Sequence, residues 1–180
     1  MENNEFVIER ISDSEKEVTI YFKVAEERYF LAVGIEKSTS NFWVFIENAN
    51  KCYLTATSEI LSLEELSKFT NLKYSEGWSK GDLRKNGKSK HTFSRISFEI
   101  LDSESYSTEE ALGLLLEYLS KHKEEIISLS KKSNAYISVC KYQYISANAG
   151  LHLDKTLIGK LNELNLPIDI DTYICGNPIT

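Results

Sequence analysis

The sequence predicts an α+β fold in which three helices pack on a largely antiparallel sheet, preceded by an N-terminal antiparallel β-meander. Apolar residues alternate with polar ones through the first third of the chain, which is typical of strands. From residue 52 onward the predicted order is strand, helix, strand, helix, two strands, helix and strand. Strands and helices grouped in this way favour an α+β arrangement with helices on one face of the sheet.

Four strands with short connections make up the predicted meander, at 18–24, 29–35, 42–46 and 52–57. An asparagine-rich segment, 48–51, is expected to separate the third strand from the fourth. We therefore assign residues 1–51 to an N-terminal meander extension and 52–180 to the α+β domain. The extension is either separate from the main sheet or continuous with it.

The three helices are predicted from their first residues. A capping box needs Ser or Thr followed three positions later by Glu or Gln, and both Ser62 with Glu65 and Ser107 with Glu110 satisfy it. An apolar stripe extends the second helix to about residue 131, which makes it the longest. Asp154 is expected to cap the third helix.

The strand predicted within 135–145 has two large, mostly apolar faces. Ile137 and Val139 lie on one face, and the other carries Tyr136, Cys140, Tyr142 and Tyr144. Such a pattern predicts a central strand that is covered on both sides.

A break at 147–150 and a short return strand at 151–153 are expected to follow, giving a hairpin. The last strand, 166–174, places Asp169 and Asp171 on its outward face because the two residues are two positions apart.

Composition and charge are those of a soluble globular protein. The 180 residues are 42% hydrophobic and carry a net charge of −6, concentrated in the first 50 residues with ten acids and five bases. This charge argues against nucleic acid; a protein partner with a basic surface, or solubility alone, explains it better. The amino terminus lacks a signal-peptide pattern and no segment is long enough to span a membrane, so we expect a cytoplasmic protein. Three widely spaced cysteines without a CxxC pair predict no disulfide framework, metal site or cofactor.

From about residue 52 to 173 the chain resembles a bacterial family of unknown function, DUF4279. The resemblance lies in the segment YLTATSEILSLEELSKFTNL, the loop GWSKGD and the two late blocks GLHLD and LNLPIDIDTY. Its most specific parts are the triplets Lys80-Gly81-Asp82 and Asp169-Ile170-Asp171. The resemblance implies a compact α+β domain and carries no established activity.

We expect a non-catalytic binding protein of the immunity type, which neutralises a basic toxin by covering its active site. Aromatic side chains and acids make tight, fast-associating interfaces. The candidate partner-binding residues are Trp43, Trp78, Tyr136, Tyr142, Tyr144, Asp169 and Asp171.

Two alternatives stay open. The loop 78–91 gathers basic residues beside Trp78, a combination suited to a small anionic ligand or to nucleic acid in a regulatory module. Its candidate anion-binding residues are Lys80, Arg84, Lys85, Lys88 and Lys90. In the second alternative, Asp169 and Asp171 lie roughly 6–7 Å apart along one strand face, close to the range of paired catalytic carboxylates in a hydrolase. No nucleophile motif accompanies them, so we assign no catalytic residue.

Overall fold

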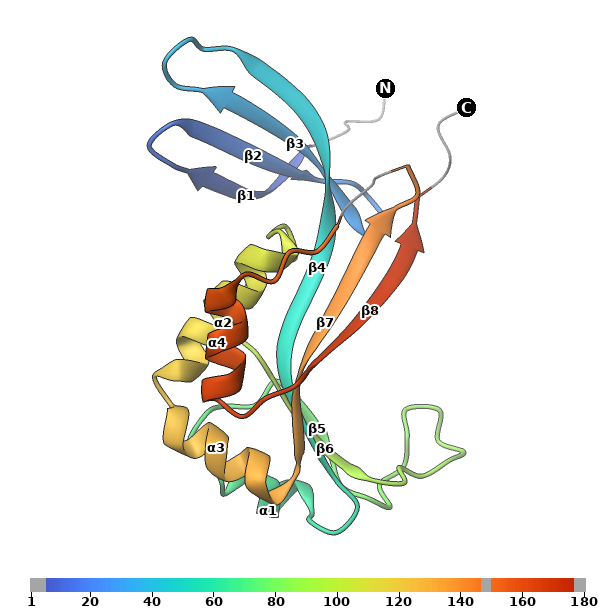
Figure 1. Ribbon diagram of the computed structural model, residues 1–180. Helices are drawn as coiled ribbons and strands as arrows, with labels where there is room; N and C mark the ends of the chain where they lie inside the picture. Colours follow the sequence, from blue (N-terminus) through green and yellow to red (C-terminus); the bar gives the residue numbers. More distant parts are fainter. Residues whose placement is uncertain (1–5, 147–149, 177–180) are drawn as a thin grey trace.

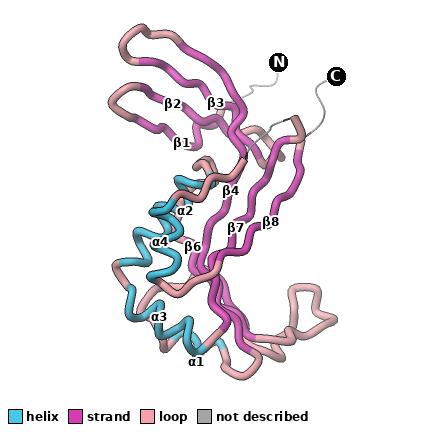
Figure 2. Tube along the Cα trace, in the orientation of Figure 1, coloured by secondary structure: helices cyan, strands magenta, loops and turns pink. Residues whose placement is uncertain are grey.

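A computed structural model describes residues 6–146 and 150–176 and shows an α+β fold with all helices on one side of a twisted sheet (Figures 1 and 2). The strands are β1 (Val7–Asp13), β2 (Glu17–Lys23), β3 (Tyr29–Glu36), β4 (Phe42–Ser58), β5 (Glu76–Trp78), β6 (Ser94–Glu99), β7 (Asn134–Tyr144) and β8 (Ile168–Cys175). The helices are α1 (Leu63–Ser67), α2 (Thr108–Ser120), α3 (Lys123–Lys132) and α4 (Lys155–Glu163).

The predicted fold class is confirmed. Strands β1 to β4 form an antiparallel meander, and the second half of β4 pairs with β6 on one side and β7 on the other. Strand β5 extends the sheet beyond β6, and β8 pairs with β7 in parallel, the one parallel pair among the described strands. The structure describes four helices instead of three.

The additional helix arises because the long helix predicted from Ser107 is divided at Lys121 and His122. Both residues make short i→i−3 backbone hydrogen bonds, to Tyr118 and Leu119, and His122 then becomes the N-cap of α3. The imidazole of His122 lies 3.6 Å from the Glu125 carboxylate. The gap that His122 leaves in the apolar stripe is therefore the point where the chain changes direction, so that α3 reaches the same core as α2.

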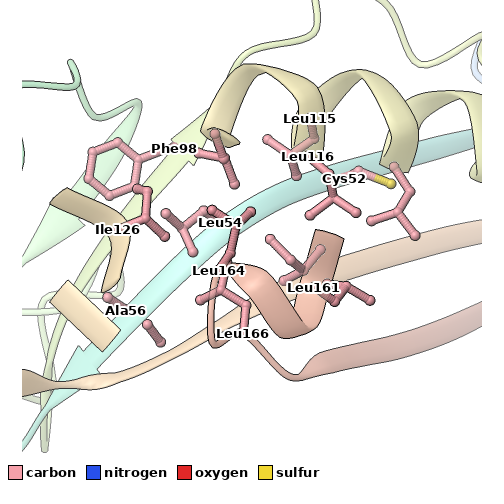
Figure 3. Close-up of a cluster of buried hydrophobic side chains, with 14 of the residues drawn as sticks. Cys52, Leu54, Ala56, Phe98, Leu115, Leu116, Ile126, Leu161, Leu164 and Leu166 are labelled. Atoms are coloured by element: carbon pink, nitrogen blue, oxygen red, sulfur yellow. The ribbon is translucent and has the colours of Figure 1, made fainter. Parts of the chain in front are cut away.

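The core lies between the helices and the sheet (Figure 3). Its buried members come from all four helices or their ends and from three strands, and include Cys52, Leu54, Phe98, Leu112, Leu115, Leu116, Ile126, Ile137, Leu161 and Leu164. A second, small cluster of Tyr21, Phe30, Ala32 and Ala49 lies where the meander joins the main sheet.

The turn expected at 48–51 is wrong, because β4 runs without interruption through these residues. Asn50 is buried and its amide donates to the carbonyl oxygens of Asn48 and Tyr106, while its side-chain oxygen accepts from Thr108 at 2.7 Å. The side-chain oxygen of Asn48 accepts from the backbone N–H of Tyr144 at 2.8 Å. These asparagines join β4 to neighbouring segments instead of turning the chain.

The hairpin expected after β7 is also wrong. Residues 151–153 form no strand, and the chain passes through α4 before returning as β8 beside β7. Asp154 caps α4 as predicted, accepting from the N–H of Leu157 at 2.8 Å. A parallel pair needs such a crossover. Of the break predicted at 147–150, residues 147–149 lie outside the described residues.

One face of β7 is covered by the helices, and the other is not. Ile137 and Val139 are buried in the helix-side core. The prediction that both faces are covered is therefore wrong, since the described helices all lie on one side (Figure 1). Tyr136 and Tyr142 of the second face are partly exposed on this open side, whereas Tyr144 is buried.

Candidate functional site: the open face of the sheet

The candidate site is the side of the main sheet that faces away from the helices, which we call the open face (Figure 2). Directly paired residues share a face, and successive residues alternate. Because Cys52, Leu54 and Ala56 enter the helix-side core, the residues between them point to the open face. Register then assigns to it Glu76, Trp78, Arg95, Ser97, Glu99, Lys51, Tyr53, Thr55, Tyr136, Ser138, Cys140, Tyr142, Asp169, Asp171 and Tyr173.

The floor of the open face consists of small hydroxyl side chains. Thr55, Ser97 and Ser138 are buried, and the hydroxyl oxygens of Thr55 and Ser138 lie 3.1 Å apart across β4 and β7. Buried hydroxyls need partners because leaving one unpaired costs roughly 1–3 kcal/mol. The short side chains leave room above them, so the larger side chains nearby form walls around a polar floor.

Arg95 is held in place above this floor. Its guanidinium donates to the hydroxyls of Ser97 at 3.0 Å and Thr55 at 3.3 Å. It also lies over the rings of Tyr53, at 5.8 Å, and Trp78, at 5.4 Å. Hydrogen bonds and cation–π contacts together fix the orientation of this cation. The Tyr53 hydroxyl lies 3.7 Å from the thiol of Cys140.

Two adjoining hollows occupy one side of the open face, with volumes of about 530 and 370 Å³. They share Lys51 and Glu99 in their walls, and the larger one reaches the junction with the meander. Its lining is predominantly acidic and contains Glu9, Glu26, Glu27, Glu99, Asp102 and Glu104 together with Lys23, Arg28 and Lys51.

Ion pairs hold the basic residues of this wall. Lys51 lies 3.0 Å from Glu104 and 3.3 Å from Glu99, and Arg28 lies 3.0 Å from Glu104. Burial lowers the pKa of Lys51, but the contacts with the two carboxylates outweigh this effect and the pKa is raised overall. The hydrogen bond to Glu104 likewise raises the pKa of Arg28. Both cations are therefore charged and paired at neutral pH.

Tyr136 marks the other side of the open face. It lines two hollows of about 270 and 340 Å³ together with Asn134, and the second of them extends to Asp169. Farther along β7, the ring of Tyr142 stacks on that of Tyr173 with centroids 5.4 Å apart. Arg28 covers the same Tyr142 ring at 5.1 Å. These aromatic side chains therefore lie on strands, and contacts with neighbouring side chains fix the positions of Tyr142 and Tyr173.

The structure brings together five of the seven predicted partner-binding residues on the open face. Tyr136 and Tyr142 lie on β7, and the register places Asp169 beside Ser138 and Asp171 beside Cys140 on the same open face. Trp78 lies at its edge on β5, stacked on His91 with centroids 4.3 Å apart. The indole nitrogen of Trp78 is buried and has no hydrogen-bond partner among the described residues.

The remaining two lie elsewhere. Tyr144 is only 6% exposed and packs edge-on against Tyr29, with centroids 5.0 Å apart. Trp43 lies in the meander, where its ring covers Gly34 on the paired strand so closely that a Cβ there would come within 2.4 Å of it. Both therefore have packing roles, and the open face is formed without them.

The five predicted anion-binding residues lie in the exposed loop between β5 and β6, which projects on the same side as the open face (Figure 1). Lys80 donates to the carbonyl oxygen of Glu59, and Lys85 lies 3.7 Å from Glu76. Arg84, Lys88 and Lys90 are exposed along the loop.

The cysteines differ in their surroundings. Burial raises the pKa of the Cys52 thiol to about 12, so this thiol is unreactive at neutral pH. Cys140 is half-buried on the open face, and Cys175 lies at the end of β8. The structure shows no disulfide among the three.

Sequence reasoning missed the centre of the open face, namely Arg95, Tyr53, Thr55 and Lys51. The available signal was the same alternation that predicted the strands. Over residues 51–57 of β4 and 95–99 of β6, every second residue is polar or carries a hydroxyl, while the residues between them are apolar. Polar positions of adjacent strands define a surface only once the pairing of the strands is known.

The comparisons with known proteins identify the family. The model of the family described as "Domain of unknown function (DUF4279)" matches residues 47–175, and the chain therefore belongs to this family. The match begins within β4, where the strand passes from the meander into the main sheet, and includes β5 to β8 with all four helices. No curated protein and no solved structure gives a significant match. Among the described helices, none is long and apolar enough to cross a membrane.

Proposed function

We propose that this member of the DUF4279 family is a non-catalytic binding protein of the immunity type, which uses its open face to cover the active site of a basic toxin. One observation carries the proposal: a broad face of the sheet, uncovered by any described element, combines ordered aromatic residues with an acidic hollow. A helix covers the equivalent face in many sheets that serve only as scaffold.

Charge supports a basic partner. The larger hollow holds six acids against three bases, and Asp169 and Asp171 add two exposed carboxylates on the opposite side. The bases in the hollow are Arg28, Lys51 and Lys23, and the first two are already paired with Glu104. Unpaired acidic charge accelerates the approach of a basic partner and penalises an acidic one.

The aromatic residues supply the short-range part of the interaction. Tyr136 and Tyr142 stand on β7, and Tyr173 stands beside Tyr142 on β8. Strand-mounted rings lose little conformational freedom on binding, so their burial contributes to affinity with a small ordering cost. Interface hot spots are enriched in tyrosine, tryptophan and arginine. Steering by the acids and anchoring by the rings thus act on the same face.

The test is protection from a toxin. The protein is co-expressed with each basic toxin domain encoded by a neighbouring gene, and growth and co-purification are measured. We expect one pair to restore growth, and a variant with both Tyr136→Ala and Asp171→Lys to lose it. Each hot-spot ring contributes about 2 kcal/mol or more, a factor of roughly 30 in affinity.

The matched control is Glu124→Lys, which makes the same charge change on an exposed position of α3, away from the open face. This variant should protect as the parent does. Loss of protection with Glu124→Lys and retention with the open-face variant would contradict the proposal, as would the absence of any protected pair.

A further inference from the structure

The meander has a second face that is apolar except at one corner and is not covered by any described element. We call it the outer meander face. It consists of three rows that cross β1 to β4, apolar throughout except for one end residue. The rows are Asp13, Val18, Ile35 and Phe42; Ile11, Ile20, Val33 and Val44; and Ile8, Phe22, Leu31 and Ile46.

None of these side chains is buried. Phe42 is 72% exposed, Ile11 57% and Val44 56%, and Phe6 packs edge-on against Phe22 at its margin. The inner face of the same strands, by contrast, carries the buried residues Tyr21, Phe30 and Ala32. The meander therefore exposes the more apolar of its two faces.

The outer meander face also lacks charge. Its single carboxylate, Asp13, lies at one corner and is paired with Lys37 at 2.6 Å. A basic partner of the kind proposed for the open face would find no charge to recognise here. A second copy of this chain, also at net charge −6, can approach this surface without placing carboxylates against carboxylates. An uncharged, apolar face is best matched by an equally apolar surface. The outer meander face of a second copy is such a surface.

The size of the face suits such a contact. Four strands about 4.8 Å apart, with rows that span five residues at about 3.4 Å each, give a footprint of roughly 330 Å². Apolar patches of this size, about 300–600 Å², are often functional in proteins. Two copies together cover roughly 650 Å² of footprint, and more accessible surface because the side chains stand out from the sheet, which is the size of a weak, reversible interface.

We propose that two copies of this chain dimerise through their outer meander faces. The two four-stranded sheets stack face to face, about 10 Å apart, as in a β-sandwich. A two-fold axis brings the same three rows together from both copies and closes the assembly at two. The inference does not rest on the proposed function, since it concerns a different surface.

Sedimentation equilibrium of the full chain from roughly 1 to 300 μM tests this proposal. We expect a reversible change from 20.6 kDa to twice that mass, because a small interface gives a dissociation constant of about micromolar order. Val44→Glu places a charge in the central row and opposes its counterpart in the second copy. It should raise the dissociation constant by roughly a hundredfold or more.

The control is Ile60→Glu, the same kind of substitution at a residue that is 92% exposed before α1. It should leave the dimer unchanged. If circular dichroism shows that Val44→Glu is unfolded, Phe42→Ser at the first residue of β4 replaces it. A parent that stays at 20.6 kDa throughout, or a dimer as stable in these folded variants as in the parent, overturns the proposal. The formation of open-ended oligomers larger than a dimer would also overturn the proposal.

Discussion

The two faces of the main sheet are made from alternate residues of the same strands, yet they differ in polarity and in charge. The helix-side face is a continuous apolar core, whereas the open face has hydroxyls at its centre, aromatic walls and acidic hollows. In β4, Leu54 is fully buried by helices, and its neighbours Tyr53 and Thr55 carry polar groups on the other side. Residues that form the core therefore alternate along the strand with residues of the face proposed for recognition.

The largest effect on stability is expected from the helix-side face. Leu54→Ala removes a side chain that is completely buried between β6, β7 and the helices. A leucine-to-alanine cavity of this kind costs about 2–5 kcal/mol. Urea unfolding followed by circular dichroism measures the loss. A change below about 1 kcal/mol would show that the core around Leu54 collapses freely, and that the two faces differ less than proposed.

The next effect concerns the link between the meander junction and α2. Thr108→Val removes the hydroxyl that donates to the buried side-chain oxygen of Asn50 at 2.7 Å and leaves that oxygen unpaired. We expect a loss of roughly 1–3 kcal/mol in the free energy of unfolding. The control is Thr92→Val, at an exposed position before β6. Equal effects of the two substitutions would mean that the buried bond does not matter for stability.

A smaller effect is expected on the open face. Tyr53→Phe removes a hydroxyl whose neighbour is the thiol of Cys140, while the ring beneath Arg95 remains. Hydroxyl bonds of this sort contribute about 0.5–1.5 kcal/mol, and sulfur is a weak partner, so the change should lie at the lower end. Urea unfolding gives the value. A loss as large as that of Leu54→Ala would contradict the division between the faces.

The smallest effect depends on pH. Burial raises the pKa of the Glu47 carboxyl, with Asn48 and Arg10 only partly opposing it. Because the folded pKa exceeds the unfolded one, the folded state loses stability as the pH rises from the unfolded pKa through the folded pKa, and the penalty persists above it. Glu47→Gln should therefore raise the melting temperature at pH 7 and lose this advantage below about pH 4. Thermal unfolding between these pH values checks the sign, and a lower melting temperature at pH 7 would contradict it.

The features that could be predicted from the sequence are those with local causes. The N-caps at Ser62, Ser107 and Asp154 were predicted and are confirmed, because each depends on a hydrogen bond to a residue three positions away. Alternation likewise predicted β2, β3 and two parts of β4, but it did not predict β1 or the continuity of β4. It shows that a strand has two faces without showing which is covered, and in β2 the covered face is that of Thr19 and Tyr21.

The features that could not be predicted depend on distant partners. Asn48 and Asn50 resemble turn residues until the backbone groups of Tyr144 and Tyr106 are seen beside them. The parallel pairing of β7 with β8 depends on the α4 crossover, and it alone places Asp169 and Asp171 on the face of Tyr136. The candidate site is thus a product of strand register, which no local pattern encodes.

Thiol labelling of Cys140 tests the central claim most directly, because this cysteine lies on the open face between Lys51 and Asp171. The modification rate with iodoacetamide is followed by mass spectrometry for the free protein and for the protein saturated with a toxin partner found by co-expression, and the buried Cys52 should stay unmodified in both as a check that the protein remains folded. If the open face is the docking surface, iodoacetamide should modify Cys140 at least about tenfold more slowly in the complex than in the free protein. An unchanged rate in a saturated complex would place the partner elsewhere and contradict the account.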